Sequence, residues 1–423
     1  MIEHQFYNRP VISTQIFPCT LPKDVADSLN RESGRIYTRV LVEHYRIQRH
    51  TDHWLSPGAG EKLNDYLSGT ILHAYSRDAA QQGFYKACKT AKAQKSSGMG
   101  PARYPHHLKT FRTTYWKNTG IRRKGDVLLL ALARGKDPIR VRLPAHLTSL
   151  PAESFIEMRL VWDRAGRRYN WHSVIEDGRL PAEPPGKGVA AVDLGEVHPA
   201  AVTDGAEGLV FCARELRSLS QYTHKRLAEF QSMLSKKEKH SRRYQRMMAR
   251  KTRFLAKQKR KRRDIEHKVS RSVVNYAVER GVGTLAIGDV RNVADGVDYS
   301  KIANQKLSNW SHGQVRKYIE YKAAAAGIRT VLENEAYTSQ TCPNPNCLHR
   351  LKPRGRVYRC PACGFCGHRD IVGASNILSR YKHGEFGHVY PSATKYRHPF
   401  ITGKRSPVDT RQVARLLREA AVL

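Results

Sequence analysis

Thr330–Leu378 reads TVLENEAYTSQTCPNPNCLHRLKPRGRVYRCPACGFCGHRDIVGASNIL, and this stretch decides how the chain is interpreted. An apolar run leads to two carboxylates, Glu333 and Glu335, which lie two residues apart. Residues at this spacing on a strand point to the same face, so we expect the two side chains to point the same way. Two cysteine pairs follow, and Asp370 then opens an amphipathic stretch typical of a helix. Acids gathered around a cysteine-clamped loop are typical of a metal-dependent enzyme that acts on phosphate groups.

Four of the eight cysteines have the spacing of a zinc ribbon. Four residues separate Cys342 from Cys347, two separate Cys360 from Cys363, and twelve lie between the pairs. Zn²⁺ takes four thiolates in a tetrahedron, and a site closed in this way is structural rather than catalytic. Cys366 follows closely and is an alternative to Cys363 as the fourth ligand. The remaining cysteines are scattered, which is not the pattern of a secreted disulfide framework.

The charge of the chain indicates a polyanionic partner. Its 423 residues include 74 Lys and Arg against 37 Asp and Glu, a net charge of +37. Such an excess is typical of nucleic-acid-binding proteins, although a merely soluble basic protein is the alternative. No apolar run approaches the ~20 residues of a membrane span, and the first residues do not form a signal peptide. We therefore expect a cytoplasmic, nucleoid-associated protein with no membrane partner.

The basic residues are densest in residues 236–268, which hold sixteen Lys or Arg against three acids and neither Pro nor Gly. A solvated face with this charge density would repel itself, so we expect a continuous helical arm, residues 220–268, that lies on nucleic-acid phosphates. The side chains expected to contact phosphate are Arg242, Arg243, Arg246, Arg250, Lys257 and Arg260.

An aromatic and basic stretch near residue 115 is a second candidate for nucleic-acid binding. Tyr115 and Trp116 lie beside Arg112 and Lys117. Rings next to cations suit base stacking with phosphate contact. Packing of the same rings in a protein core explains the pattern equally well.

The rest of the chain predicts two regions that are joined by a Pro-rich linker at residues 180–188. Before the linker, residues 24–117 are mainly helical in pattern, and residues 125–176 read as short strands with a hairpin turn near Asp163. We expect these strands to pair with N-terminal ones in a small barrel, with the helices inserted. After the linker, a buried strand ends in Asp193, which is typical of an RNase H-like sheet.

Residues 189–378 resemble the RuvC nuclease domain of TnpB, the RNA-guided nuclease of insertion sequences, and of its compact type V CRISPR relatives. The resemblance lies in Val192-Asp193-Leu194-Gly195, Asn309 to Gly327, Tyr337-Thr338-Ser339-Gln340-Thr341-Cys342, the second cysteine pair, and His368-Arg369-Asp370 with Gly373-Ala374-Ser375-Asn376-Ile377. It implies an α/β RNase H-like (RuvC) domain with an inserted zinc ribbon, preceded by a wedge-like β-barrel that carries a helical recognition domain. The implied boundaries are 1–22 and 120–186 for the barrel, 23–119 for the recognition domain, 187–340 and 367–379 for the nuclease domain with its basic arm, 341–366 for the zinc ribbon and 380–423 for a basic C-terminal tail.

One position departs from the family pattern. The second catalytic acid of the family is usually a Glu at the end of a central strand, and that position is Gly288 in this chain. Some TnpB proteins and the eukaryotic Fanzor relatives carry this Glu on a later strand instead, at a position that matches Glu335. We therefore assign Glu335 as the second acid, with Asp289 as the fallback and the absence of a functional second acid as a further alternative. Glu333 is expected to lie outside the metal shell.

The resemblance implies an RNA-guided DNA endonuclease of a transposable element or of a CRISPR system. The protein would bind a guide RNA, read a short motif beside a double-stranded DNA target, and act as one copy per guide. Asp193, Glu335 and Asp370 would hold two Mg²⁺ ions, Arg369 would contact the scissile phosphate, and Zn²⁺ would be structural. The alternatives are a nuclease-deficient, repressor-like DNA-binding protein and a zinc-ribbon RNA-binding protein without catalysis. A strand-transferring transposase is disfavoured because no His-hydrophobe-His motif with a Tyr nucleophile is present.

Overall fold

The structure is a computed structural model that describes residues 12–63, 69–98, 102–176, 178, 180–290, 300, 304, 310–353 and 355–398. The chain divides into two compact units. Among the described residues, the N-terminal unit covers residues 12–178 and the C-terminal unit covers residues 180–398. The boundary falls at the predicted Pro-rich linker.

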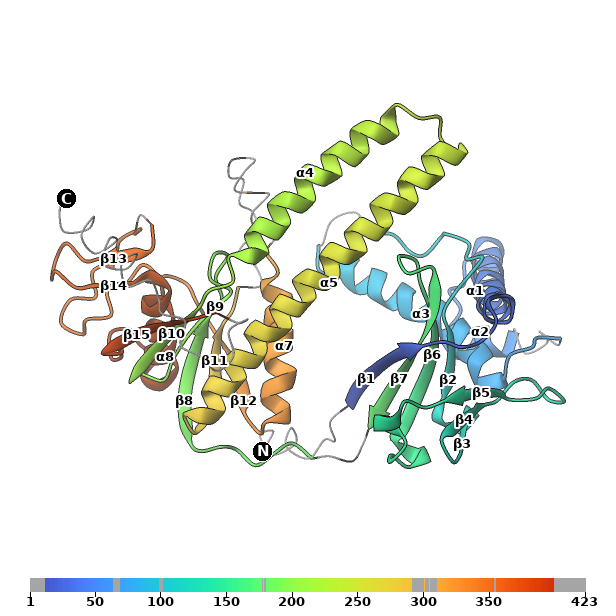
Figure 1. Ribbon diagram of the computed structural model, residues 1–423, viewed down its shortest axis with the longest axis horizontal. Coiled ribbons are helices and arrows are strands. Elements are labelled where there is room, and N and C mark those ends of the chain that lie inside the picture. Colours follow the sequence, from blue (N-terminus) through green and yellow to red (C-terminus); the bar gives the residue numbers. More distant parts are fainter. Residues whose placement is uncertain are drawn as a thin grey trace. The chain divides into compact units, whose positions relative to one another are not determined.

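In its described residues, the N-terminal unit contains two antiparallel sheets and three α-helices. Figure 1 shows their arrangement within the unit. Its elements are β1 (Ile12–Pro18), α1 (Lys23–Thr51), α2 (Pro57–Leu63), α3 (Ala74–Ser96), β2 (Thr114–Lys117), β3 (Ile121–Lys124), β4 (Val127–Leu130), β5 (Ile139–Arg142), β6 (Phe155–Asp163) and β7 (Arg168–Glu176). One sheet has the order β1-β7-β6-β2 and the other β3-β4-β5. Strand β1 pairs with β7 as predicted, but the strands form two sheets rather than one hydrogen-bonded barrel.

Helix α1 is joined to the larger sheet by a buried amide. Asn30 donates to the carbonyl of Leu160, and its side-chain oxygen accepts the N–H and the hydroxyl of Thr114. Buried polar groups that are fully hydrogen-bonded in this way fix how two elements pack. Since β2 belongs to this sheet, the helical region ends before residue 114 and not at residue 119 as predicted.

The C-terminal unit is built on one six-stranded mixed sheet. Its elements are β8 (Gly188–Asp193), β9 (Ala200–Thr203), β10 (Glu207–Phe211), α4 (Glu215–Ser235), α5 (Arg242–Glu279), β11 (Val282–Gly288), α7 (His312–Ala325), β12 (Arg329–Glu333), β13 (Val357–Arg359), β14 (Cys366–His368), α8 (Arg369–His383) and β15 (Ala393–Arg397). The sheet order is β12-β11-β8-β9-β10-β15. Strands β8, β9 and β10 form an antiparallel meander, whereas β11 pairs parallel to β8 and β12 parallel to β11.

The two faces of this sheet pack against different helices. Ala190 and Val192 of β8 lie in the core that α5 and α7 share, whereas Ala191 packs with Ile377 of α8. Because neighbours along a strand alternate between faces, Asp193 points to the same side as Ala191, towards α8. The sheet therefore presents the end of its central strand to the first turn of α8.

The basic arm differs from the prediction. It is a hairpin of two helices, α4 and α5, and not one continuous helix (Figure 1). His240 takes a left-handed φ of 69° in the connection, and Ser241 then caps α5 by accepting the N–H of Tyr244 at 3.1 Å. A Ser at an N-cap is a strong helix start, and it outweighs the run of good helix formers on either side.

The C-terminal region also differs from a simple tail. Helix α8 continues to His383, and β15 pairs parallel to β10 at the edge of the sheet. The predicted boundary at residue 380 is therefore wrong, whereas the part of the predicted tail after residue 398 and the motif residue Asn309 lie outside the described residues. Among the helices that the structure describes, none is both long and apolar enough to span a membrane.

Candidate active site

Three acids that are far apart in the sequence lie in one region of the C-terminal unit, where the charges of Asp370 and Glu335 act on Asp193. Asp193 ends β8, Glu335 lies in the turn after β12, and Asp370 is the second residue of α8. Asp193 reaches α8 at Gly373, where an added Cβ would lie 2.8 Å from Asp193 Oδ2. Gly373 lies one helical turn after Asp370, so both carboxylates occupy the same end and side of α8. Glycine at position 373 leaves the space that the carboxylate of Asp193 fills.

Two of the three acids have raised pKa values. The pKa of Asp193 is raised well above its usual value by burial and by the charges of Asp370 and Glu335, which outweigh Arg369 and Arg356. Burial and the charge of Asp289 raise the pKa of Glu335 to about 7. Buried carboxylates that repel one another are stable as anions only beside a cation.

The structure gives a steric reason for the Gly at position 288. Gly288 ends β11 on the side of α8, and a Cβ added there would lie 3.0 Å from Glu335 Oε2 and 3.0 Å from Ile377 Cδ1. The carboxylate of Glu335 therefore covers the place where a side chain of residue 288 would start. Glu333 is the last residue of β12, so Glu335 lies beyond the strand and the predicted common strand face does not apply to the pair.

Asp370 is held from two sides by residues that the sequence patterns do not mark. His198 Nδ1 lies 2.7 Å from Asp370 Oδ2, and Arg356 donates to Asp370 Oδ1 at 3.0 Å. Burial raises the pKa of Asp370, but the hydrogen bond from His198 and the nearby charges of His368 and Arg356 outweigh burial and lower it. His198 lies five residues after Asp193 and Arg356 lies between the two cysteine pairs, and neither has a spacing that distinguishes it.

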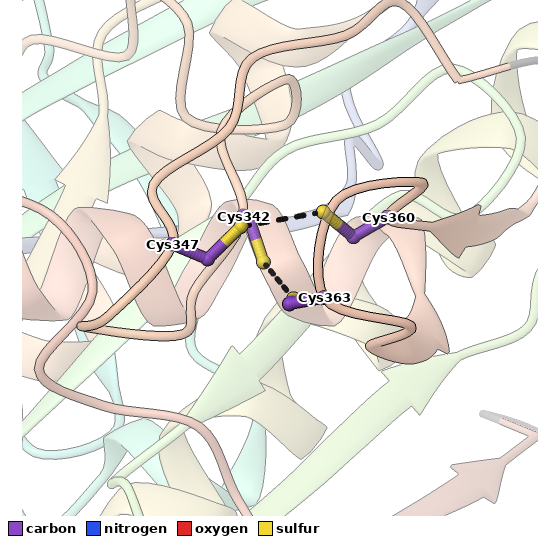
Figure 2. A group of neighbouring side chains, drawn as sticks. All are labelled: Cys342, Cys347, Cys360 and Cys363. Carbon is purple, nitrogen blue, oxygen red and sulfur yellow. Dashed lines mark hydrogen bonds between the residues drawn. The ribbon is translucent and has the colours of Figure 1, made fainter.

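The four cysteines of the expected zinc ribbon form one cluster (Figure 2). Cys342 Sγ lies 3.6 Å from Cys363 Sγ, and Cys347 Sγ lies 3.5 Å from Cys360 Sγ. The N–H of Phe365 lowers the pKa of Cys363 to about 7. Cys366 lies in β14, outside this group, so the geometry favours Cys363 as the fourth ligand.

The donor sets fit two kinds of metal. Four clustered thiols match the ligands of structural Zn²⁺. Carboxylate oxygens are the donors that Mg²⁺ prefers, and the mutually repelling Asp193, Glu335 and Asp370 provide the charge to hold it. A different group of possible ligand atoms, one ring nitrogen each of His198 and His368 and a carboxylate oxygen of Asp370, lies within 4.8 Å of one another.

The expected nucleic-acid contacts divide into exposed and buried residues. The six arm residues Arg242, Arg243, Arg246, Arg250, Lys257 and Arg260 are all exposed on α5. Trp116, in contrast, is only 1% exposed and packs against Trp171 with ring centroids 5.8 Å apart. It is a core residue, and the prediction that it stacks on a base is wrong. Tyr115 is half-buried, and the guanidinium groups of Arg112 and Arg159 lie 5.2 and 5.5 Å from its ring.

Two sequence families match the C-terminal part of the chain. The family described as "Cas12f1-like, TNB domain" matches residues 312–377, and the family described as "Probable transposase" matches residues 172–294. Together these matches include Asp193, Glu335, Asp370 and the four clustered cysteines.

Individual relatives agree with these matches. A CRISPR-associated endodeoxyribonuclease Cas12f1 of Sulfoacidibacillus thermotolerans is 32% identical over 26% of this chain and 25% of its own length. A TnpB-like protein of Methanocaldococcus jannaschii is 30% identical over 30% of this chain and 45% of its own length. The chain thus matches less than half the length of either protein. A putative transposase of Methanocaldococcus jannaschii is 31% identical over 24% of this chain and 95% of its own length.

The fold is similar to that of a solved Cas12f1 protein. The structure described as a Cas12f1-sgRNA-target DNA complex aligns over 84% of this chain and 82% of that one, with a TM-score of 0.57 and 12% sequence identity. A two-part, Cas12-like fold is therefore present. With the sequence matches, the chain belongs to the family of TnpB proteins and compact type V effectors.

Proposed function

We propose that this protein is an RNA-guided DNA endonuclease whose RuvC-like site is formed by Asp193, Glu335 and Asp370. The observation that carries the proposal is the convergence of these acids between the end of β8, the turn after β12 and the start of α8. The names of the Cas12f1 relative, an endodeoxyribonuclease, and of the solved Cas12f1 complex with sgRNA and target DNA support the same reaction class and partners. The strand order of the mixed sheet supports an RNase H-like assignment.

The site residues have separate roles in this proposal. Asp193, Glu335 and Asp370 hold two Mg²⁺ ions, which supply activation of water and stabilisation of the leaving oxygen when bound. His198 and Arg356 orient the carboxylate of Asp370. Arg369, whose charge lowers the pKa of Asp193, contacts a phosphate at the site. The zinc ribbon, residues 341–366, holds one structural Zn²⁺ and supports α8 through contacts of Val372 with Cys342 and Tyr358.

The N-terminal unit and the arm have the roles of recognition. We assign the sheets of the N-terminal unit to a wedge-like domain and its helices to a recognition domain that reads the target-adjacent motif. The exposed basic residues of α5 contact the phosphates of the guide RNA or of its duplex with the target. One copy of the protein binds one guide RNA.

Cleavage by acid variants is the test of this function. The protein is purified with co-expressed RNA, the bound RNA is sequenced, and Mg²⁺-dependent cutting of a matched DNA target is measured. Asp193→Asn, Glu335→Gln and Asp370→Asn are expected to abolish cutting and keep guide-dependent DNA binding, whereas Asp289→Asn keeps both. Cutting by Glu335→Gln would remove that residue from the site. Failure to recover a discrete RNA would contradict the guided reaction altogether.

The Gly at position 288 favours one second candidate, a guided DNA-binding protein that does not cut, because the usual acid is missing there. In that case the wild-type protein would bind DNA with its guide but show no cutting at any Mg²⁺ concentration.

A further inference from the structure

Tyr337 has a backbone conformation that a large side chain seldom adopts. Its φ is 66°, in the left-handed region that favours Gly or Asn. Its carbonyl accepts three hydrogen bonds, from the N–H groups of Gln340 and Thr341 and from the Thr341 hydroxyl. Unfavourable conformations of this kind persist where the surroundings fix them, and they occur often at functional sites.

The ring of Tyr337 does not contribute to a core. It is 51% exposed, and the Arg350 guanidinium lies 3.9 Å from the ring centroid. Thr341 and Arg350 form an antiparallel bridge, and Leu351 donates its N–H to the carbonyl of Gln340 at 2.9 Å. The zinc ribbon thus holds Arg350 over Tyr337. A Gly at position 337 would make the same turn without strain, so the turn alone does not explain the exposed ring.

The turn that carries Tyr337 is fixed to two of the candidate catalytic acids. The Thr338 N–H and hydroxyl both donate to the carbonyl of Glu335, at 3.1 and 2.9 Å. Asn376 of α8, which is fully buried, donates to the carbonyls of Thr338 and Thr341, each at 2.8 Å. Since α8 also carries Asp370, Tyr337 has a fixed position relative to the site.

We propose that Tyr337 and Arg350 form a stacking platform for one base of the DNA strand that enters the nuclease site. Aromatic rings stack on bases without regard to sequence, and a guanidinium adds cation–π and phosphate contacts. The platform selects an unpaired strand, because a base inside a duplex has no free face. This assignment of the substrate rests on the proposed nuclease function of the neighbouring acids.

Photocrosslinking tests the platform without a need for cutting. The full-length protein is mixed with a single-stranded DNA oligonucleotide that carries 5-iododeoxyuridine, irradiated, digested and analysed by mass spectrometry. A crosslink to the peptide that contains Tyr337 is expected. Tyr337→Gly and Tyr337→Ala should lose this crosslink and keep those on α5, whereas Tyr337→Phe should retain it. An equal yield in Tyr337→Gly, or a crosslink that forms only with the matching RNA oligonucleotide, overturns the proposal.

Guide-dependent cutting gives the second measurement. Tyr337→Gly removes the strain, so its melting temperature should equal or exceed that of the wild type, while cutting slows by roughly tenfold and guide-dependent binding is unchanged. Arg350→Ala should slow cutting in the same direction. Tyr321→Ala is the matched control, because Tyr321 is also 51% exposed and lies on α7. Cutting at the wild-type rate by Tyr337→Gly would contradict the platform and leave the nuclease assignment intact. A wild-type protein that shows the crosslink but never cuts would contradict the nuclease assignment and leave base stacking on Tyr337 intact.

Discussion

His198 Nδ1 lies 2.7 Å from Asp370 Oδ2, and both side chains are more than nine-tenths buried. Arg356 binds the other oxygen of the same carboxylate at 3.0 Å. The orientation of Asp370 therefore depends on a residue of the loop between β8 and β9 and on a residue between the two cysteine pairs. Partners of metal-binding carboxylates fix the direction of their lone pairs, which is needed for a defined metal site.

We predict that His198→Ala slows guide-dependent cutting by about 10–100-fold and raises the Mg²⁺ concentration at half-maximal rate. The carboxylate of Asp370 would keep its hydrogen bond from Arg356 but lose the one that fixes its second oxygen, and it could rotate. Cutting rates measured across a Mg²⁺ titration provide the check. His146→Ala is the control, because His146 is exposed and lies in the other unit. A wild-type Mg²⁺ titration for His198→Ala would contradict the positioning role.

The contact between Gly288 and Glu335 predicts that the second acid can be moved. Gly288→Glu alone should crowd Glu335, lower the free energy of unfolding by about 1–3 kcal/mol and slow cutting. In Gly288→Glu combined with Glu335→Ala, the new carboxylate takes the vacated space, and cutting should recover at least tenfold relative to Glu335→Ala. Thermal unfolding and cutting rates measure both effects. The combination of Gly288→Gln with Glu335→Ala introduces a side chain of the same size without the charge. Recovery of cutting in this variant would contradict a metal-binding role of the new carboxylate.

The sequence predicted the parts of this site that local patterns determine. Asp193 ends a buried strand, which the apolar run before it predicts. The four cysteines have the spacing of metal ligands, which predicts that they form one cluster. Glu335 needed a resemblance, because nothing local separates it from Glu333. His198 and Arg356 contact Asp370 only through the tertiary fold, and no spacing in the chain encodes such a contact.

The errors in the fold have similar causes. Trp116 was equally compatible with a core or with a base, since composition does not report which face of a strand is buried. The absence of Pro and Gly from residues 220–268 predicts one helix, but the Ser241 cap and the left-handed His240 divide the arm. Strand β15 was missed because five residues at a sheet edge carry little apolar pattern.

The cysteine cluster predicts one tightly bound Zn²⁺ per chain. Cys360→Ser should lose this Zn²⁺ and lower the melting temperature by at least about 5 °C, because Cys342, Tyr358, Cys360 and Val372 share one small core beside α8. Zinc content by elemental analysis and thermal unfolding are the measurements. Cys366→Ser should keep both values. Loss of zinc in Cys366→Ser, with retention in Cys363→Ser, would reverse the assignment of the fourth ligand.

The raised pKa of Glu335, about 7, predicts a pH-dependent need for Mg²⁺. Mg²⁺ must displace the proton, so the Mg²⁺ concentration at half-maximal cutting should rise about fivefold or more between pH 7 and pH 6. In the absence of metal, by contrast, a higher pH is unfavourable for the stability of the folded protein. The folded protein binds the proton more tightly than the unfolded chain, so the free energy of unfolding falls as the pH rises from about 4.5 towards 7.

Mg²⁺ titrations at pH 6 and 7, and thermal unfolding of the metal-free protein at pH 5, 6 and 7, measure these two effects. In Glu335→Gln the fall in metal-free stability with pH should become smaller, because only Asp193 then keeps a raised pKa among the three acids. A fall that is as large in Glu335→Gln as in the wild type would show that Glu335 does not bind its proton more tightly in the folded state.

The arm predicts how binding depends on salt. Arg242, Arg246 and Arg250 are exposed at four-residue spacing on α5, so they lie along one side of the helix. If each neutralises one phosphate, replacing all three by Ala should lower the slope of log affinity against log salt by about 2–3 and weaken RNA binding most at low salt. Replacement by Lys keeps the charge and should keep the slope, so the pair of triple variants separates charge from shape. An unchanged slope in the Ala variant would mean that these cations face only solvent. The strong basic excess of the chain would then have to act through other residues.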